Sequence, residues 1–166
     1  MKIQHILLIG MVLVGIYYAF NNYNTQNNSS EKVEVLNSLA VGKWETSYST
    51  AIKKAKDSGK MLLLDFTGSD WCGWCVKLDN EVFSKKEFQD YADKNLILLK
   101  LDFPRAIKQS NELKKQNRAL ASKFGIKGYP TIIVLNNNEK LIGRTGYQKG
   151  GPKKYIAHLK GLIGTN

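Results

Sequence analysis

Cysteine and histidine are scarce in this chain, which limits the metal and haem sites that it can form. Its 166 residues include two cysteines and two histidines. Structural zinc needs about four ligands, and His5 and His158 lie near opposite ends of the chain, so no Cys/His set has suitable spacing. Attachment of c-type haem needs a histidine directly after a Cys-x-x-Cys pair, and Val76 occupies that position. The sequence therefore excludes haem attachment and disfavours zinc.

A motif for a nucleotide cofactor is also missing. Dinucleotide-binding domains hold pyrophosphate with a Gly-x-Gly-x-x-Gly run that follows a strand, and this chain contains no such run. We expect no cofactor, so electrons for any redox reaction should come by exchange with another dithiol protein.

A basic stripe of the kind that binds nucleic acid is not visible, although the net charge is +11. The lysines come as scattered pairs, interleaved with acids and amides in different predicted helices. These pairs are Lys53-Lys54, Lys85-Lys86, Lys114-Lys115 and Lys153-Lys154. Nucleic-acid binding is therefore not expected. The positive charge is better suited to attraction to an anionic membrane surface or to acidic clients.

Both cysteines lie in one short segment, Trp71-Cys72-Gly73-Trp74-Cys75, just after the apolar run Met61–Phe66. A strand that delivers Cys-x-x-Cys to the first turn of a helix places the leading sulfur beside unpaired N–H groups and the positive end of the helix dipole. The thiol pKa then falls from about 8.5 toward about 3.5–7.5. A redox-active dithiol with Cys72 as nucleophile is predicted. A structural disulfide is the alternative, although a bridge between residues so close in sequence closes a very small loop and constrains the unfolded chain little.

The first twenty residues are predicted to be a membrane anchor or a signal peptide. Ile6–Phe20 contains no charged side chain, and its length lies between a signal-peptide core and the roughly 20 residues of a spanning helix. No small-x-small cleavage site follows the run, and Lys2 supplies the nearby positive charge, which leaves the rest of the chain outside the cytoplasm. We expect an exported, periplasmic or extracytoplasmic protein tethered by residues 6–20, with a cleaved signal as the alternative.

The remaining chain divides into a linker and a globular domain. Residues 21–32 are dominated by asparagine and serine and have almost nothing to bury, so a flexible polar linker is predicted. Residues 33–166 are enough to bury a core without disulfide staples.

Within the globular domain, apolar runs and capping residues predict alternating strands and helices, and therefore an α/β domain around a central sheet. The predicted strands are 61–66, 96–101, 131–135 and 140–144, and the predicted helices are 49–58, one opening at the cysteines, 84–93, 110–124 and 152–162. Ser84 and Glu87 have capping-box spacing. The turn Asn136-Asn137-Asn138 predicts an antiparallel hairpin of the last two strands.

Four segments together resemble the thioredoxin-like fold family over residues 44–162. They are Asp65-Phe66, Trp71-Cys72-x-x-Cys75, Lys100-Leu101-Asp102 and Gly125–Thr131. The resemblance implies a mixed sheet of four to five strands flanked by helices. Ser69–Cys72, Lys77 and Glu81–Ser84 are also similar to exported domains that receive electrons from membrane thiol reductant conductors, or form their C-terminal domain.

The resemblance implies catalytic roles for three residues. Cys72 would attack a client disulfide, and Cys75 would resolve the mixed disulfide. Asp65 would be a buried carboxylate with a raised pKa that takes the proton of Cys75, and Lys100 would face it. The alternatives are a strand-end polar group for Asp65 and a surface lysine for Lys100.

A client-binding surface is implied as well. The peptide bond before Pro130 is expected to be cis, so that the backbone of Tyr129 can pair with an extended client segment. Trp71 and Trp74 would form an apolar platform beside the sulfurs, with packing against the loop as the alternative for Trp71.

Two departures from the family pattern affect these roles. Six residues separate Asp65 from Cys72, one more than in ordinary thioredoxins, so the carboxylate could be offset from the sulfurs. The pair Gly73-Trp74 between the cysteines matches neither the common reductase pair Gly-Pro nor the common isomerase pair Gly-His. The direction of electron flow is therefore open, and the lack of an imidazole beside Cys72 argues against a strong oxidant.

The sequence thus predicts an exported, membrane-tethered thiol–disulfide oxidoreductase that reduces disulfides in other exported proteins. A membrane or exported dithiol protein would recharge it. An oxidase or isomerase using the same residues is one alternative. A non-catalytic module that holds clients, with the cysteines locked as a bridge, is another.

Overall fold

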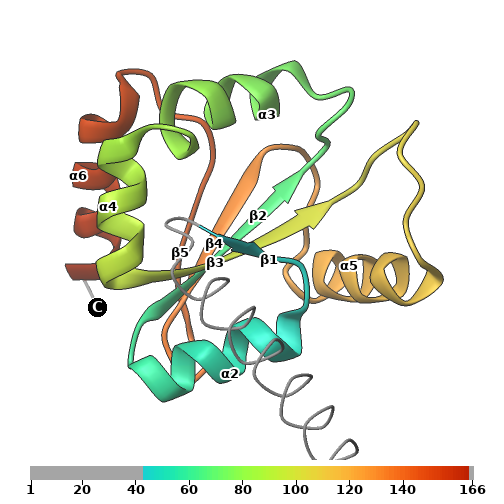
Figure 1. The fold of residues 1–166 in the computed structure, drawn as a ribbon, viewed down its shortest axis with the longest axis horizontal. Helices are drawn as coiled ribbons and strands as arrows, with labels where there is room; N and C mark the ends of the chain where they lie inside the picture. The colour runs from blue at the N-terminus through green and yellow to red at the C-terminus, as the bar shows by residue number, and fades with distance from the viewer. Residues whose placement is uncertain (1–42, 165–166) are drawn as a thin grey trace, which may run out of the picture. The chain divides into compact units, whose positions relative to one another are not determined.

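A mixed five-stranded sheet forms the centre of the structure, a computed structural model that describes residues 43–164 (Figure 1). The strands are β1 (Trp44–Glu45), β2 (Met61–Thr67), β3 (Leu96–Asp102), β4 (Thr131–Leu135) and β5 (Leu141–Thr145). Their spatial order is β1-β3-β2-β4-β5. β3 runs parallel to β1 and β2, whereas β4 runs antiparallel to β2 and β5. The predicted mixed sheet is confirmed, and β1 is a strand that the sequence analysis missed.

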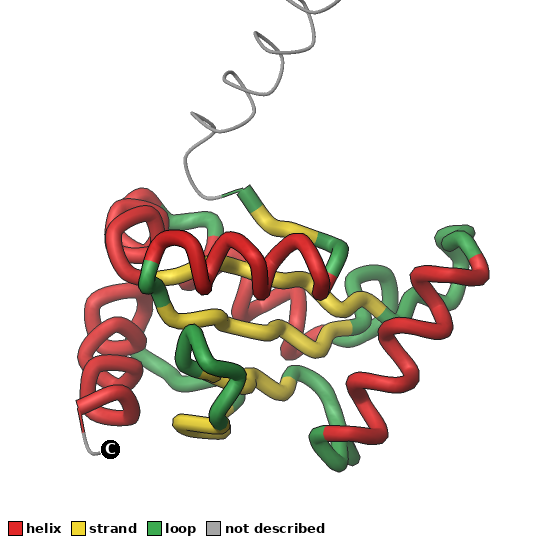
Figure 2. The backbone as a smooth tube through the Cα atoms, turned by 90° about the horizontal axis from the view of Figure 1, so that it is seen from below, coloured by secondary structure: helices red, strands yellow, loops and turns green. Residues whose placement is uncertain are grey.

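Helices cover both faces of the sheet. Successive side chains of β2 point to opposite sides, and the leucines on each side pack against a different set of helices. Leu62 and Leu64 pack with Ala51 of α2 and Leu120 of α5, whereas Leu63 packs with α4 and α6. Figure 2 shows the strands lying between helices. The central strand β2 is buried on both faces, which explains why it reads as a continuous apolar run.

The helices follow the predicted ranges closely. They are α2 (Tyr48–Ser58), α3 (Gly73–Leu78), the π-helical turn η1 (Asp79–Phe83), α4 (Lys86–Asn95), α5 (Asn111–Lys123) and α6 (Gly151–Gly164). The hydroxyl of Ser110 accepts a hydrogen bond from the N–H of Leu113 and caps α5, while Gly59 ends α2 with a φ of 70°, as glycine at a helix end commonly does.

The predicted capping box at Ser84 is wrong. α3 continues through η1 to Phe83, so Ser84 has helical backbone angles rather than the extended backbone of an N-cap residue. Its hydroxyl donates to the carbonyl of Asn80 at 3.2 Å. Lys85 takes the N-cap position of α4 and makes no side-chain capping bond. The boundary is set by the π-helical turn, which the local pattern does not reveal.

The predicted hairpin is confirmed as β4 and β5. The side chain of Asn136 accepts hydrogen bonds from the N–H groups of Asn138 and Lys140, and Glu139 has a φ of 64°. An asparagine side chain that satisfies the backbone of the next residues is a typical way to close a tight turn.

The predicted anchor and linker, residues 1–20 and 21–32, lie outside the described residues. Within residues 43–164, no helix is both long enough and apolar enough to cross a membrane.

Candidate active site

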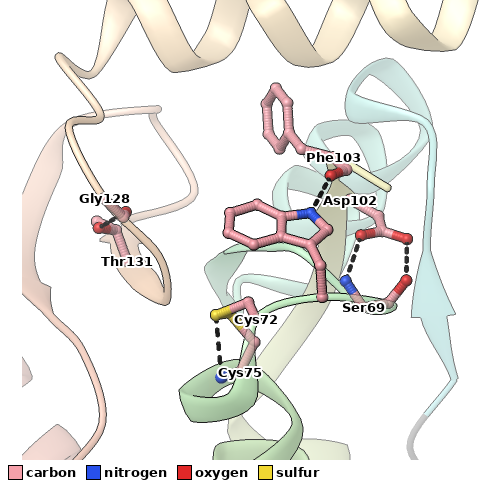
Figure 3. The surroundings of a disulfide bond; sticks show 8 residues. Ser69, Cys72, Cys75, Asp102, Phe103, Gly128 and Thr131 are labelled. Atoms are coloured by element: carbon pink, nitrogen blue, oxygen red, sulfur yellow. Dashed lines mark hydrogen bonds between the residues drawn. A yellow bond between two sulfur atoms is a disulfide. The ribbon is translucent and has the colours of Figure 1, made fainter. Parts of the chain in front are cut away.

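Both cysteines lie where α3 begins, beyond the end of β2. Cys72 is the N-cap residue of α3 with extended backbone, and its Sγ accepts a hydrogen bond from the N–H of Cys75 at 3.2 Å (Figure 3). The two residues are joined in a disulfide, and Cys72 and Cys75 are only 7% and 4% exposed. The predicted placement of the leading sulfur against a helix-start N–H group is confirmed.

Asp65 is buried on β2 and shares a cavity with Cys75. This cavity of about 180 Å³ is lined by Asp65, Thr67, Ser69, Cys75, Val76, Asp79 and Lys100. Asp65 is 4% exposed, and its Oδ1 has no hydrogen-bond partner among residues 43–164. Burial raises the pKa of Asp65 to about 7, with Lys100 lowering it and Asp79 and Asp102 raising it further. The extra residue of the loop therefore does not separate the carboxyl group from Cys75.

Gly68 explains how the longer loop is accommodated. The N–H groups of Trp71 and Cys72 both donate to the carbonyl of Gly68, which folds the loop back on itself. A methyl group at Gly68 would lie 2.5 Å from the indole of Trp71. The absence of a side chain at this residue lets the ring lie directly over the loop.

The loop is also held to the last residue of β3 and to the residue that follows it. The Asp102 carboxylate accepts hydrogen bonds from the N–H and the hydroxyl of Ser69, at 2.9 and 2.6 Å (Figure 3). Nε1 of Trp71 donates to the carbonyl of Phe103 at 2.8 Å. These contacts come from a segment more than thirty residues away in the sequence.

Asp70 adds three contacts to the same segment. Its carboxylate accepts from the consecutive backbone N–H groups of Arg105, Ala106 and Ile107. These hydrogen bonds hold the pKa of Asp70 below its usual range, and the one from Arg105 has the largest effect.

Lys100 lies on β3 beside Asp65, since the two residues pair in the parallel register. Its Nζ is 3.9 Å from Oδ1 of Asp79 and 5.3 Å from the ring centre of Trp44. Lys100 thus lines the cavity between two carboxyl groups. Asp79 follows Cys75 by one helical turn, and it is a residue of this cavity that the sequence analysis missed.

The two tryptophans of the motif differ in their surroundings. Trp71 is 37% exposed, with the ring of Tyr129 edge-on at 5.6 Å and the guanidinium of Arg105 at 4.2 Å from its centre. Trp74 is 58% exposed and lies 5.2 Å from the ring of Tyr147. Trp71 both packs on the loop and presents surface, and Trp74 is the more open of the two.

The peptide bond between Tyr129 and Pro130 is cis, as expected. The hydroxyl of Thr131 donates to the carbonyl of Gly128 at 2.7 Å, and Figure 3 shows these two residues across from Cys72. A methyl group at Gly146 would lie 3.1 Å from the Pro130 carbonyl oxygen, so the segment after β5 passes close to this loop.

A metal centre does not form among the residues described. Within residues 43–164, no group of three or more His, Cys, Asp or Glu side chains is placed to hold a metal ion.

A model of the thioredoxin-like domain family matches residues 48–162. The chain belongs to the thioredoxin-like family. This thioredoxin-like chain is 32% identical over 120 residues to the disulfide bond reductase DsbH of Chlamydia pneumoniae, covering 72% of each chain. It is 34% identical over 103 residues to the thioredoxin-related protein DsbJ of the same organism, covering 62% of this chain and 30% of DsbJ.

The solved structure of a DsbH oxidoreductase is similar to the thioredoxin-like chain, with a TM-score of 0.71 at 31% sequence identity. The match covers 75% of this chain and 85% of that one. Fold and family are thus shown, and the cysteine pair of the motif lies within disulfide distance.

Other residues around the thioredoxin-like site were also missed by the sequence analysis. Asp79 had a local signal, because it lies four residues after Cys75 on a continuing helical segment. Arg105 and Tyr147 had no local sequence signal, since each reaches the motif from a loop distant in sequence.

Proposed function

We propose that this chain is a thiol–disulfide oxidoreductase that reduces disulfides in other exported proteins. The observation that carries the proposal is the shared cavity of Asp65 and Cys75 beneath a helix that Cys72 caps. A carboxyl group whose pKa is about 7 can exchange protons near neutral pH, as a general base must.

The reaction follows from these positions. In the reduced protein, the Cys72 thiolate attacks one sulfur of a client disulfide, and the other client sulfur leaves as a thiolate. Cys75 gives its proton to Asp65 and attacks Sγ of Cys72. The bond between Cys72 and Cys75 forms, and the second client sulfur leaves as a thiolate. The client gains two electrons and the protein loses two, which gives the disulfide form of the structure.

The reductive direction has two supports. One relative, 32% identical, is named a disulfide bond reductase. Trp74 provides no imidazolium to stabilise the Cys72 thiolate, and a stabilised thiolate is what makes a strong oxidant. An oxidase or isomerase with the same residues is the alternative.

Clients would bind along the surface beside the disulfide. We infer that the backbone of Tyr129, next to Pro130, pairs with an extended client segment, while Trp71 and Trp74 contact its side chains. The exposed faces of both indoles support this role.

Export and recharging belong to the same proposal. Residues 6–20 would tether the protein outside the cytoplasm. A membrane or exported dithiol protein would return two electrons to the disulfide by exchange, since the proposed cycle uses no cofactor.

Trapping of clients tests the chemistry. A Cys75→Ser protein should accumulate mixed disulfides through Cys72, because the second attack is lost, and a Cys72→Ser protein should form none. A Cys72→Ser/Cys75→Ser protein controls for plain binding. If that double variant captures the same clients equally well, the protein is a non-catalytic binding module and the proposal is wrong.

The reduction potential tests the direction. The protein would be equilibrated in glutathione buffers and followed through the fluorescence of Trp71 and Trp74. A value near about −270 mV, as in thioredoxin, supports a reductase, whereas a value near about −120 mV, as in a strong periplasmic oxidant, reverses the direction.

A further inference from the structure

A basic hollow lies beside the redox site, between η1 and the start of α6. Its volume is about 400 Å³, and the charged residues that line it are Lys77, Glu81, Lys85 and Lys149. Three lysines line this hollow together with a single carboxylate. α6 contacts η1, so the hollow is formed by segments that the fold brings together.

The single carboxylate is already engaged. The hydroxyl of Tyr147 donates to Oε2 of Glu81 at 2.5 Å, and Nζ of Lys77 is 3.8 Å from Oε1. Within the described residues, no carboxylate lies within 4.0 Å of Nζ of Lys85 or Lys149. The hollow therefore carries positive charge that the protein itself does not neutralise.

The hollow adjoins the cysteine motif through two aromatic rings. Nζ of Lys77 lies 5.2 Å from the ring centre of Trp74 and 5.5 Å from that of Tyr147. Trp74 stands between the two cysteines in the sequence, and Gly146, the residue before Tyr147, packs against the carbonyl of Pro130. An occupant of the hollow would therefore lie next to a client bound at the sulfurs.

The backbone that carries Lys149 to the hollow has a fixed shape. Gly150 and Gly151 have φ values of 121° and 73°, which residues with a side chain rarely adopt. A methyl group at Gly150 would also collide with Cδ of Lys154. The turn that positions Lys149 thus depends on two glycines.

We propose that this hollow binds an acidic segment of the client protein, close in space to the client disulfide. The proposal rests on the proposed function, because it names the class of client for the same site. Unneutralised charge at the edge of a binding surface speeds association with a partner of opposite charge. An anionic membrane is the less suitable occupant, because a bilayer seated here would block the indole of Trp74 from the client that the proposed function places on it.

Two model peptides test the proposal with the reduced full-length protein. Both carry the same disulfide, and they differ only in two aspartates or two asparagines beside one cysteine. The measured quantity is the second-order rate constant for oxidation of the protein by each peptide. We expect the aspartate peptide to react roughly tenfold faster at low salt, with the ratio falling toward one as salt screens the charges.

Charge reversal locates the effect. In Lys85→Glu/Lys149→Glu the ratio of the two rate constants should fall to about one or invert. Lys115→Glu/Lys140→Glu makes the same change in net charge at exposed lysines outside the hollow and should keep the ratio. A wild-type ratio of one, or a ratio that both double variants reduce equally, overturns the proposal.

Binding without chemistry separates this proposal from the proposed function. The Cys72→Ser/Cys75→Ser protein should bind the aspartate peptide more tightly than the asparagine peptide in a titration. If that preference is present but the wild-type protein reduces neither peptide, binding of an acidic segment in the hollow is supported and the proposed function is wrong. If vesicles of anionic lipid bind through Lys85 and Lys149 while the peptides react equally, the hollow is a membrane contact and the proposal is wrong.

Discussion

Asp65 and Cys75 line one cavity, although Asp65 belongs to β2 and Cys75 to α3. Lys100 from the neighbouring strand and Asp79 from η1 complete its charged lining. The buried carboxyl group carries a pKa of about 7, and it is therefore close to half-ionised at neutral pH. We therefore expect the proton of Cys75 to pass to this carboxyl group during the second step of the proposed reaction.

Asp65→Asn should slow the attack of Cys75 on the mixed disulfide, because the proton of Cys75 loses its acceptor. We expect a loss on the order of 10²-fold, measured by rapid quenching with a peptide disulfide. In the wild type this rate should rise with pH through about 7, as Asp65 ionises, and in the variant that rise should be absent. An unchanged pH profile would remove Asp65 from the mechanism.

The stability of the oxidised protein should depend on pH through the same carboxyl group. Its pKa is raised from 3.8 to about 7 in the folded state, so the folded protein holds a proton that the unfolded chain releases. The free energy of unfolding should fall as pH rises from about 4 to 7, by on the order of 4 kcal/mol.

Urea denaturation of the wild type and of Asp65→Asn at pH 4 and pH 8 measures this dependence. The variant should lack the fall, and Asp57→Asn, a change at an exposed carboxylate, should retain it. Equal slopes for all three proteins would show that Asp65 titrates normally.

Gly68→Ala should destabilise the active-site loop, because the added methyl group collides with the indole of Trp71. We expect a loss of about 1–3 kcal/mol and altered tryptophan fluorescence. Gly161→Ala is the matched control. It lies within α6, its methyl group would meet no atom of residues 43–164 within 4 Å, and it should raise the free energy of unfolding by up to about 1 kcal/mol. If Gly68→Ala and Gly161→Ala change the free energy of unfolding equally, the collision with Trp71 is contradicted.

Asp70→Asn should loosen the segment after β3. The carboxylate accepts from three successive N–H groups, those of Arg105, Ala106 and Ile107, and a neutral amide accepts more weakly. Hydrogen exchange of these amides should accelerate, whereas Asp57→Asn should leave them unchanged. Since the pKa of Asp70 is lowered in the folded protein, the wild type should show the same loosening as the pH falls through that pKa.

Tyr155→Phe should stabilise the protein by about 1 kcal/mol. The hydroxyl of Tyr155 is buried without a hydrogen-bond partner among the described residues, and an unsatisfied buried polar group costs stability. Tyr147→Phe is the contrasting change, because its hydroxyl donates to Glu81, and it should not stabilise. Thermal denaturation of both variants measures the difference, and a destabilised Tyr155→Phe protein would show that the hydroxyl is satisfied.

Local patterns predicted most of the elements, since each depends on residues close together in the chain. The apolar run at β2 and the three asparagines between β4 and β5 each act within one turn or strand. The two-residue strand β1 was missed because so short a segment has no period. The cap at Ser84 was misassigned because η1 extends the preceding helix.

The sequence by itself determined where the cysteine pair lies and predicted its redox role, because two cysteines three residues apart at a helix start need little more than local geometry to form a dithiol. Only the tertiary structure decided their surroundings. Asp65 and Lys100 come together through strand pairing, and Tyr147 reaches Trp74 from the loop after the edge strand β5. Contacts between residues so far apart depend on how the helices and strands pack, and no spacing along the chain encodes them.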